Sequence, residues 1–215
     1  NMLEIDSFLV QTGKCIPIKV KEVKKIQKKF LRNFHSKQRF IFFKGKLDKS
    51  FTFKSNVENV LAKIDNDLKL MFEEMDATEC LNISNSKNKK DIAYTTFIYN
   101  KKMPYVFMKN RSSFYDLRTL THEIGHAFEK YINKDLKYFF DFNDNIEIAE
   151  SQAITIEFIY ARALDNLIQT EKAKEYYVYI LLKNLLLIQD ALCIFEFEKL
   201  SYAKKIVSVA QLNIL

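Results

Sequence analysis

The sequence contains very little glycine, proline and tryptophan: among 215 residues there are 3 Gly, 2 Pro and no Trp. β-Sandwiches and small barrels need many tight turns rich in Gly and Pro, so this composition argues against them. It also excludes collagen-like and Pro-rich linker architectures. With 48% hydrophobic and 28% charged residues, the chain has the composition of a core-bearing globular protein. The scarcity of helix breakers favours long helices.

Cysteine is also scarce, because the chain has only Cys15, Cys80 and Cys193. Their odd number, their wide spacing and the lack of a CxxC pair argue against a disulfide framework and against a thiolate zinc site. We therefore expect a cytoplasmic location. No secretory signal peptide is expected, because acidic rather than basic residues precede any apolar run. The most apolar tract, 176–197, is interrupted by charged residues and predicts a buried helix rather than a membrane span.

Positive charge is concentrated in one part of the chain. Fourteen of the 34 Lys and Arg lie between Lys14 and Lys54, among only two acidic residues. Such a stretch can bind phosphates, so one hypothesis is nucleic-acid binding that weakens steeply with salt. We favour the alternative of a solvated helix face over 19–35, where apolar residues recur at helical spacing. We predict a basic N-terminal segment or lobe over 1–55 and a core over 56–215, with no nucleic-acid or membrane partner.

The pattern of apolar residues predicts a mainly helical fold with a small β-ribbon or sheet. Helical periodicity is found over 57–75, 115–133, 145–169, 173–198 and 201–212. β-Branched and aromatic residues predict strands over 92–99 and 105–108, and a hairpin from 39–43 and 50–53. The polar stretch 82–90 predicts a loop.

The strongest indication of function is a His-Glu-x-x-His motif formed by His122, Glu123 and His126, in a chain with only three histidines. Two imidazoles four residues apart on a helix project from one face and can bind one Zn²⁺ ion. Glu123 lies beside the first ligand, where it can act as general base on a zinc-bound water. The motif predicts a metallopeptidase site, and the alternative is two histidines satisfied in a core helix. Gly125 costs the helix about 1 kcal/mol relative to Ala, so we expect another backbone or a substrate to approach closely there.

A zinc peptidase site needs a third protein ligand and one open coordination position. Ile132 occupies the position of the third His in the class with a further His six residues on, which excludes that class. In the next predicted helix, Glu150 and Glu157 fall on or beside the apolar stripe and face inward. We predict Glu150 as the third ligand, with Glu147 as second choice. Glu157 either orients a ligating imidazole or pairs with Arg162 or a lysine.

The stretches TLTHEIGHAFEKYI (119–132) and IEIAESQAITIEF (146–158) together resemble the zinc-binding core of the oligoendopeptidase F and thimet oligopeptidase family, a family of gluzincins. Its members carry a TL.HE.GHA helix and then an AE..S....E helix whose first Glu is the third zinc ligand. The resemblance implies a zincin-like helical core, one Zn²⁺ ion bound by His122, His126 and Glu150, and short peptides as substrates. Residues 87–110 resemble the segment that places an edge strand beside the substrate, and we expect the peptide to pair with the strand around 105–108.

The resemblance covers about residues 57–205 and ends before the segment in which the family keeps the Tyr and His that contact the substrate. The family's Gly-Ala-Tyr turn is altered to Ile92-Ala93-Tyr94. Tyr94, Tyr99 and Tyr202 remain as candidate donors to the oxyanion. Two hypotheses follow: a zinc-dependent metalloendopeptidase or oligopeptidase, and a shortened relative that binds zinc or peptide with weak catalysis or none.

Overall fold

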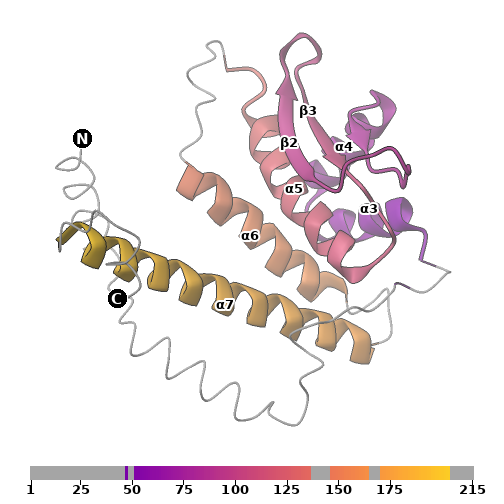
Figure 1. Ribbon diagram of the computed structural model, residues 1–215. Coiled ribbons are helices and arrows are strands. Elements are labelled where there is room, and N and C mark those ends of the chain that lie inside the picture. Colours follow the sequence, from indigo (N-terminus) through magenta and orange to yellow (C-terminus); the bar gives the residue numbers. More distant parts are fainter. Residues whose placement is uncertain (1–46, 48–50, 137–145, 165–169, 204–215) are drawn as a thin grey trace. The chain divides into compact units, whose positions relative to one another are not determined.

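The computed structural model describes residues 47, 51–136, 146–164 and 170–203 (Figure 1). The chain divides into two compact units, one of residues 39–181 and one of residues 1–38 together with 182–215. The elements, in chain order, are α3 (Phe53–Ile64), α4 (Asn66–Ala77), β1 (Leu81–Asn82), β2 (Ala93–Ile98), η1 (Tyr99–Lys101), β3 (Met103–Met108), α5 (Phe114–Ile132), α6 (Ile146–Ala163) and α7 (Thr170–Ala203). The prediction of a mainly helical fold with a small sheet is confirmed. The division near residue 55 stays a prediction.

Two helices, α3 and α4, replace the single helix predicted over 57–75. Asp65 between them has an extended backbone (φ −159°, ψ 139°), and its carboxylate accepts hydrogen bonds from the backbone N–H groups of Asp67 (2.7 Å) and Leu68 (3.4 Å). Asp65 is therefore the N-cap of α4. The prediction was wrong here because the apolar spacing continues through the break: Leu61 before it and Leu68 after it are both buried.

Other predictions fall at the start of the described residues. The strand predicted over 50–53 is wrong, since Phe53 begins α3 and packs its ring edge-on against Phe51 in the core. The predicted strand 39–43, the predicted helix 19–35 and most of the basic segment Lys14–Lys54 lie outside the described residues.

The sheet has three strands in the order β1-β3-β2, with β1 parallel and β2 antiparallel to β3. β2 and β3 confirm the strands predicted over 92–99 and 105–108. β1 was not predicted, because a strand of two residues is too short to show an alternation of apolar and polar residues. β1 pairs Leu81 with Val106, and β2 pairs Thr95 with Val106 from the other side. The expectation that a peptide pairs with 105–108 is therefore wrong, because both sides of that segment are occupied. In the described part of the chain, β1 and β2 are the two edge strands, and β2, with six residues, is the longer of them.

The start of α5 is fixed by a capping box. The Ser113 side chain accepts from the Asp116 backbone N–H (3.1 Å), and the Asp116 carboxylate accepts from the Ser113 N–H (3.0 Å). The same carboxylate accepts from the Arg111 N–H (2.9 Å). From this start, Leu117, Leu120 and further apolar residues of α5 are buried in the core. α5 packs against β2 and β3 and also against α6 (Figure 1).

The predicted helix over 145–169 is observed as α6, and the helices predicted over 173–198 and 201–212 are continuous as far as Ala203 in α7. The first turns of α7 belong to the core: the Tyr176 ring lies 5.4 Å from the Phe114 ring, centroid to centroid. Across the described ranges, no helix combines the length and apolarity needed to cross a membrane.

Candidate metal centre

The two helices that carry the predicted site touch at Gly125. A Cβ atom at this position would lie 2.5 Å from the Cα atom of Ala153 in α6, closer than such atoms approach in proteins. The close approach expected from the sequence is confirmed, and the approaching backbone is that of α6. Because the helix backbones meet here, side chains within one turn of the contact on each helix can converge.

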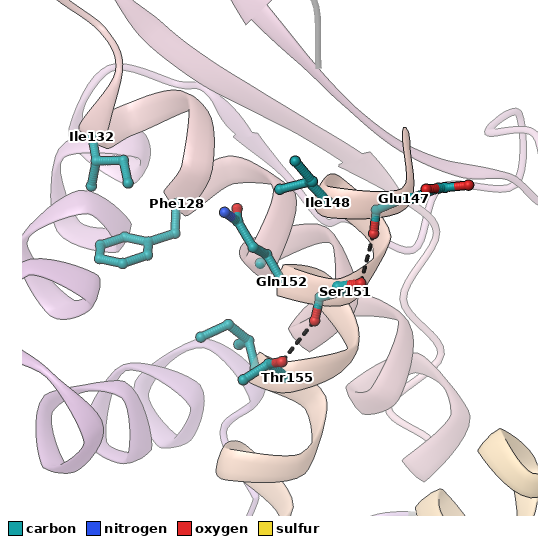
Figure 2. A pocket seen from close by; sticks show the side chains of 9 residues that line it. Phe128, Ile132, Glu147, Ile148, Ser151, Gln152 and Thr155 are labelled. Atoms are coloured by element: carbon teal, nitrogen blue, oxygen red, sulfur yellow. Dashed lines mark hydrogen bonds between the residues drawn. The ribbon is translucent and has the colours of Figure 1, made fainter. Parts of the chain in front are cut away.

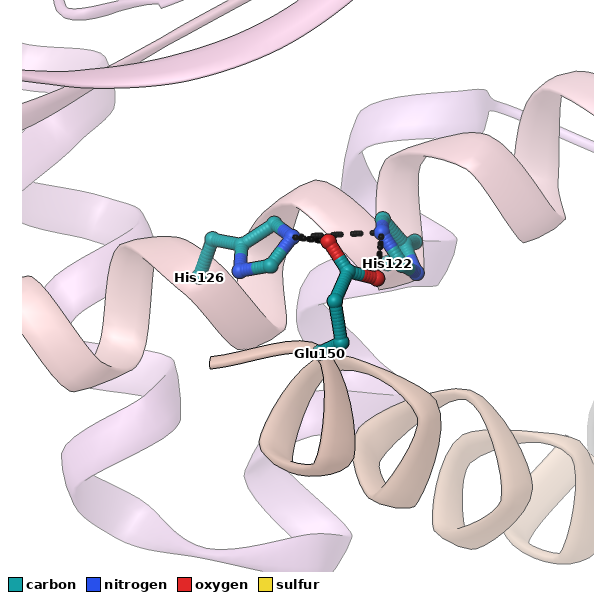
Figure 3. A group of neighbouring side chains, drawn as sticks. All are labelled: His122, His126 and Glu150. Atoms are coloured by element: carbon teal, nitrogen blue, oxygen red, sulfur yellow. Dashed lines mark hydrogen bonds and ion pairs between the residues drawn. The ribbon is translucent and has the colours of Figure 1, made fainter. Parts of the chain in front are cut away.

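His122, His126 and Glu150 converge beside this contact (Figure 3). The two Nε2 atoms are 3.2 Å apart, and each lies 3.5 Å from one carboxylate oxygen of Glu150. Two ligand atoms that bind one tetrahedral zinc ion at about 2.0–2.1 Å are about 3.3 Å from each other. The spacing of these three groups therefore fits a zinc ion, and their imidazole and carboxylate chemistry is that of zinc peptidase ligands.

Glu157 fixes how His122 presents its ring. The Nδ1 atom of His122 lies 2.7 Å from the Glu157 carboxylate, which can only accept a hydrogen bond when ionised. Nδ1 therefore carries the proton, and the lone pair of Nε2 is directed to His126 and Glu150. Burial disfavours a charged imidazole, but the hydrogen bond and charge of Glu157, with the charges of Glu150 and Glu123, raise the pKa of His122. This excess of negative charge favours a bound cation.

Arg118 is the second partner of Glu157. Its Nε and one terminal nitrogen lie 2.9 and 3.3 Å from the two carboxylate oxygens. The Glu157 side chain is fully buried, whereas Arg118 is 23% exposed. The suggested pairing with Arg162 is wrong, because the guanidinium of Arg162 lies over the ring of Tyr177.

Glu123 faces the sheet. Its carboxylate accepts a 2.6 Å hydrogen bond from the Thr95 hydroxyl, which also lies 3.0 Å from the Glu123 carbonyl oxygen. Burial is the main cause that raises the pKa of Glu123, and the Thr95 hydrogen bond and the His122 charge oppose it. A carboxylate with a raised pKa suits a general base near neutral pH. The sequence analysis missed Thr95, which is 28 residues from Glu123.

Glu147, the second choice as ligand, does not belong to the cluster. It lies on the wall of a separate groove of about 490 Å³ between α5 and α6, together with Phe128, Ile132 and Ile148 (Figure 2). None of the three cluster residues lines this groove. The geometry thus favours Glu150 over Glu147.

The candidate oxyanion donors find little support. Tyr94 stacks on Phe107 with ring centroids 5.2 Å apart. Because side chains alternate along a strand, Tyr94 lies on the opposite face of β2 from Thr95 and Glu123. Tyr99 packs edge-on against Phe97 and is half-exposed. Tyr202 belongs to the other compact unit, so its role stays a prediction.

Comparison with known proteins locates this arrangement among solved folds. Neither a family model nor a curated protein matches the sequence. Solved structures do match: a protein described as oligoendopeptidase F from Bacillus anthracis strain Ames is 21% identical over 80% of this chain, with a TM-score of 0.68. PZ peptidase A with an inhibitor is 20% identical over 85% (TM-score 0.68), and another oligoendopeptidase F is 21% identical over 90% (TM-score 0.69).

The match covers 31%, 36% and 37% of those three chains, so this chain spans about a third of their length. Their helical architecture agrees with the fold described above. The resemblance that the motifs indicated is confirmed at the level of the fold: the chain has the fold of oligoendopeptidase F-like proteins.

Proposed function

We propose that this protein is a zinc-dependent peptidase that hydrolyses peptide bonds in short peptides. The observation that carries the proposal is the convergence of two imidazole Nε2 atoms and a carboxylate at 3.2–3.5 Å, next to the buried carboxylate of Glu123. The solved neighbours of the same fold are described as peptidases, which supports the same reaction class here.

In this proposal His122, His126 and Glu150 hold the zinc ion. Bound zinc would lower the pKa of a water molecule towards about 7 and polarise the scissile carbonyl. Glu150 is half-exposed, so the cluster is open to solvent on one side. An open side is what distinguishes a catalytic zinc site from a closed structural one.

Glu123 supplies the proton transfers. Its carboxylate takes a proton from the attacking water and later delivers it to the leaving amine. Thr95 holds one carboxylate oxygen at 2.6 Å and so limits the rotation of this side chain. The other oxygen is left for the proton transfers.

The edge of β2 supplies the peptide-binding surface. A peptide that pairs with this edge gains main-chain hydrogen bonds that do not depend on its sequence. Thr95, which contacts Glu123, belongs to the same strand, so a peptide paired here lies beside the general base. Short peptides of varied sequence are therefore the proposed substrate class.

The test replaces Glu123 by Gln and uses Glu147→Gln as a matched control on the neighbouring helix. Zinc-loaded wild-type protein is incubated with a library of quenched fluorescent peptides, with and without a chelator, and bound zinc is measured separately. Wild type and E147Q should cleave, the chelator should stop cleavage, and E123Q should lose cleavage while it keeps zinc. Cleavage by E123Q at the wild-type rate would refute the role of Glu123.

A second candidate is a relative of these peptidases that binds zinc or peptide with weak catalysis or none. One observation favours it: Tyr94, a candidate oxyanion donor, lies on the opposite face of β2 from Thr95 and Glu123. In the same experiment, this candidate predicts zinc binding by wild type without cleavage of any peptide. The proposal also includes the cytoplasmic location predicted from the cysteines. Consistent with a chain that does not depend on disulfides, Cys80 is a buried free thiol.

A further inference from the structure

We infer that Arg118 is a positioning residue of the metal centre, which acts on His122 through Glu157. The inference rests on the proposed function, because it concerns how one ligand of the proposed zinc ion is oriented. It goes beyond that function in assigning a role to a residue outside the motif.

Polar side chains of α5 and α6 contact one another in a continuous row between the two helices. Arg118, His122 and His126 follow one another at four-residue intervals along α5, so they share one face. Glu150 and Glu157 are seven residues apart on α6 and also share a face. Each glutamate bridges two neighbours on α5: Glu150 contacts both histidines, and Glu157 contacts His122 and Arg118.

Glu157 depends on Arg118 for its position. Its carboxylate is fully buried, and a buried carboxylate is costly unless charged partners and hydrogen bonds compensate it. This carboxylate makes polar contacts with His122 and Arg118. The planar guanidinium donates two hydrogen bonds, one to each oxygen, and so fixes the plane of the carboxylate as well as its distance.

That plane determines how His122 is held. One oxygen of Glu157 accepts from Nδ1 of His122 at 2.7 Å, which keeps the proton on Nδ1 and the lone pair on Nε2. Without Arg118, the carboxylate would lose both guanidinium donors and the constraint on its plane. The His122 ring would then sample orientations and tautomers that do not present Nε2 to the metal.

The test measures zinc affinity in the full chain by competition with a chromophoric chelator. Loss of a residue that orients a metal ligand typically weakens metal binding about 10- to 100-fold. We expect R118M to raise the zinc Kd by this factor and R118K, which keeps the charge without the planar fork, to fall between R118M and wild type. The matched control is R162M, which removes an exposed arginine of α6 that does not contact the cluster, and it should leave the Kd unchanged.

A double-mutant cycle separates action through Glu157 from a general structural effect. If Arg118 acts through Glu157, R118M should change the zinc Kd by no more than about twofold in the E157Q background. The visible absorption spectrum of the Co²⁺-loaded protein gives a second readout, and the ligand-field bands should shift in R118M but not in R162M. Should R118M fail to fold, as judged by circular dichroism of the metal-free protein, R118K and its cycle with E157Q decide the question.

Two results would overturn the inference: a wild-type Kd and Co²⁺ spectrum in R118M, or the same loss of affinity in the E157Q background as in wild type. The proposed function has its own control, H126A. If H126A keeps the wild-type zinc Kd, the zinc site itself is wrong. If H126A loses zinc while R118M does not, the zinc site stands and only the role of Arg118 fails.

Discussion

Replacement of Gly125 by Ala tests whether the contact between α5 and α6 sets the geometry of the metal centre. The new Cβ atom would lie 2.5 Å from the Ala153 Cα atom and 3.3 Å from its Cβ atom. Carbon atoms in favourable contact are about 3.5–4.0 Å apart. The two helices must therefore separate locally by about 1 Å, since the closest neighbour is backbone and cannot rotate away.

Two opposing terms determine the effect on stability. Overpacking of this kind costs about 1–3 kcal/mol, whereas Ala in place of Gly inside a helix gains about 1 kcal/mol. We expect metal-free G125A to be destabilised by about 0–2 kcal/mol in urea denaturation.

G125A should also weaken zinc binding. Glu150 lies three residues from Ala153 on α6, so a separation of the helices moves its carboxylate away from the histidines. Ligand positions need to hold within about 0.5 Å, so we expect the zinc Kd to rise at least about tenfold, which corresponds to 1.4 kcal/mol. Ser151→Thr, which adds one methyl group on the exposed side of α6, is the control and should bind zinc normally. A wild-type zinc Kd in G125A would refute the reasoning.

Two further predictions concern Thr95 and Asp65. Thr95→Val keeps the shape of the side chain but removes the hydrogen bond to the Glu123 carboxylate. Since a hydrogen bond to a charged group contributes about 1.5–3 kcal/mol, kcat for peptide cleavage should fall about tenfold or more. The zinc Kd should be unchanged. An unaltered kcat would show that Thr95 does not position the base. Asp65→Ala removes the N-cap of α4 and should lower the free energy of unfolding by about 1 kcal/mol, measured by urea denaturation. Asp65→Asn can still cap the helix and should retain most of this free energy of unfolding. Equal losses of unfolding free energy in both variants would indicate an effect of charge rather than of capping.

The parts of the site that lie close in sequence were predictable. The four-residue spacing of His122 and His126 requires a common helix face, and the low helix propensity of Gly125 indicated a close neighbour. The burial of Glu157 followed from its place beside an apolar stripe, whereas Glu150 points to the histidines but is half-exposed. In each case the physical cause acts within one or two helix turns, which is the range that periodicity describes.

The contacts that the sequence analysis missed depend on pairing between distant segments. Thr95 reaches Glu123 only because β2 packs against α5, and the central place of β3 depends on β1, a strand of two residues. Arg118 carried a readable signal, because it stands one helical turn before His122, but its partner lies on another helix. Asp65 also carried a signal as a capping residue, which the continuing apolar spacing concealed.

The register of β2 has a consequence for the turn that joins it to β3. Thr95 pairs with Val106 and points to Glu123, while its neighbours Tyr94 and Thr96 point away. A slip of one residue between the strands would exchange the two faces of β2. Insertions or deletions in the short turn at residues 99–102 would therefore present the wrong side chain to Glu123. The catalytic site therefore constrains the length of this turn, although none of its residues belongs to the motif.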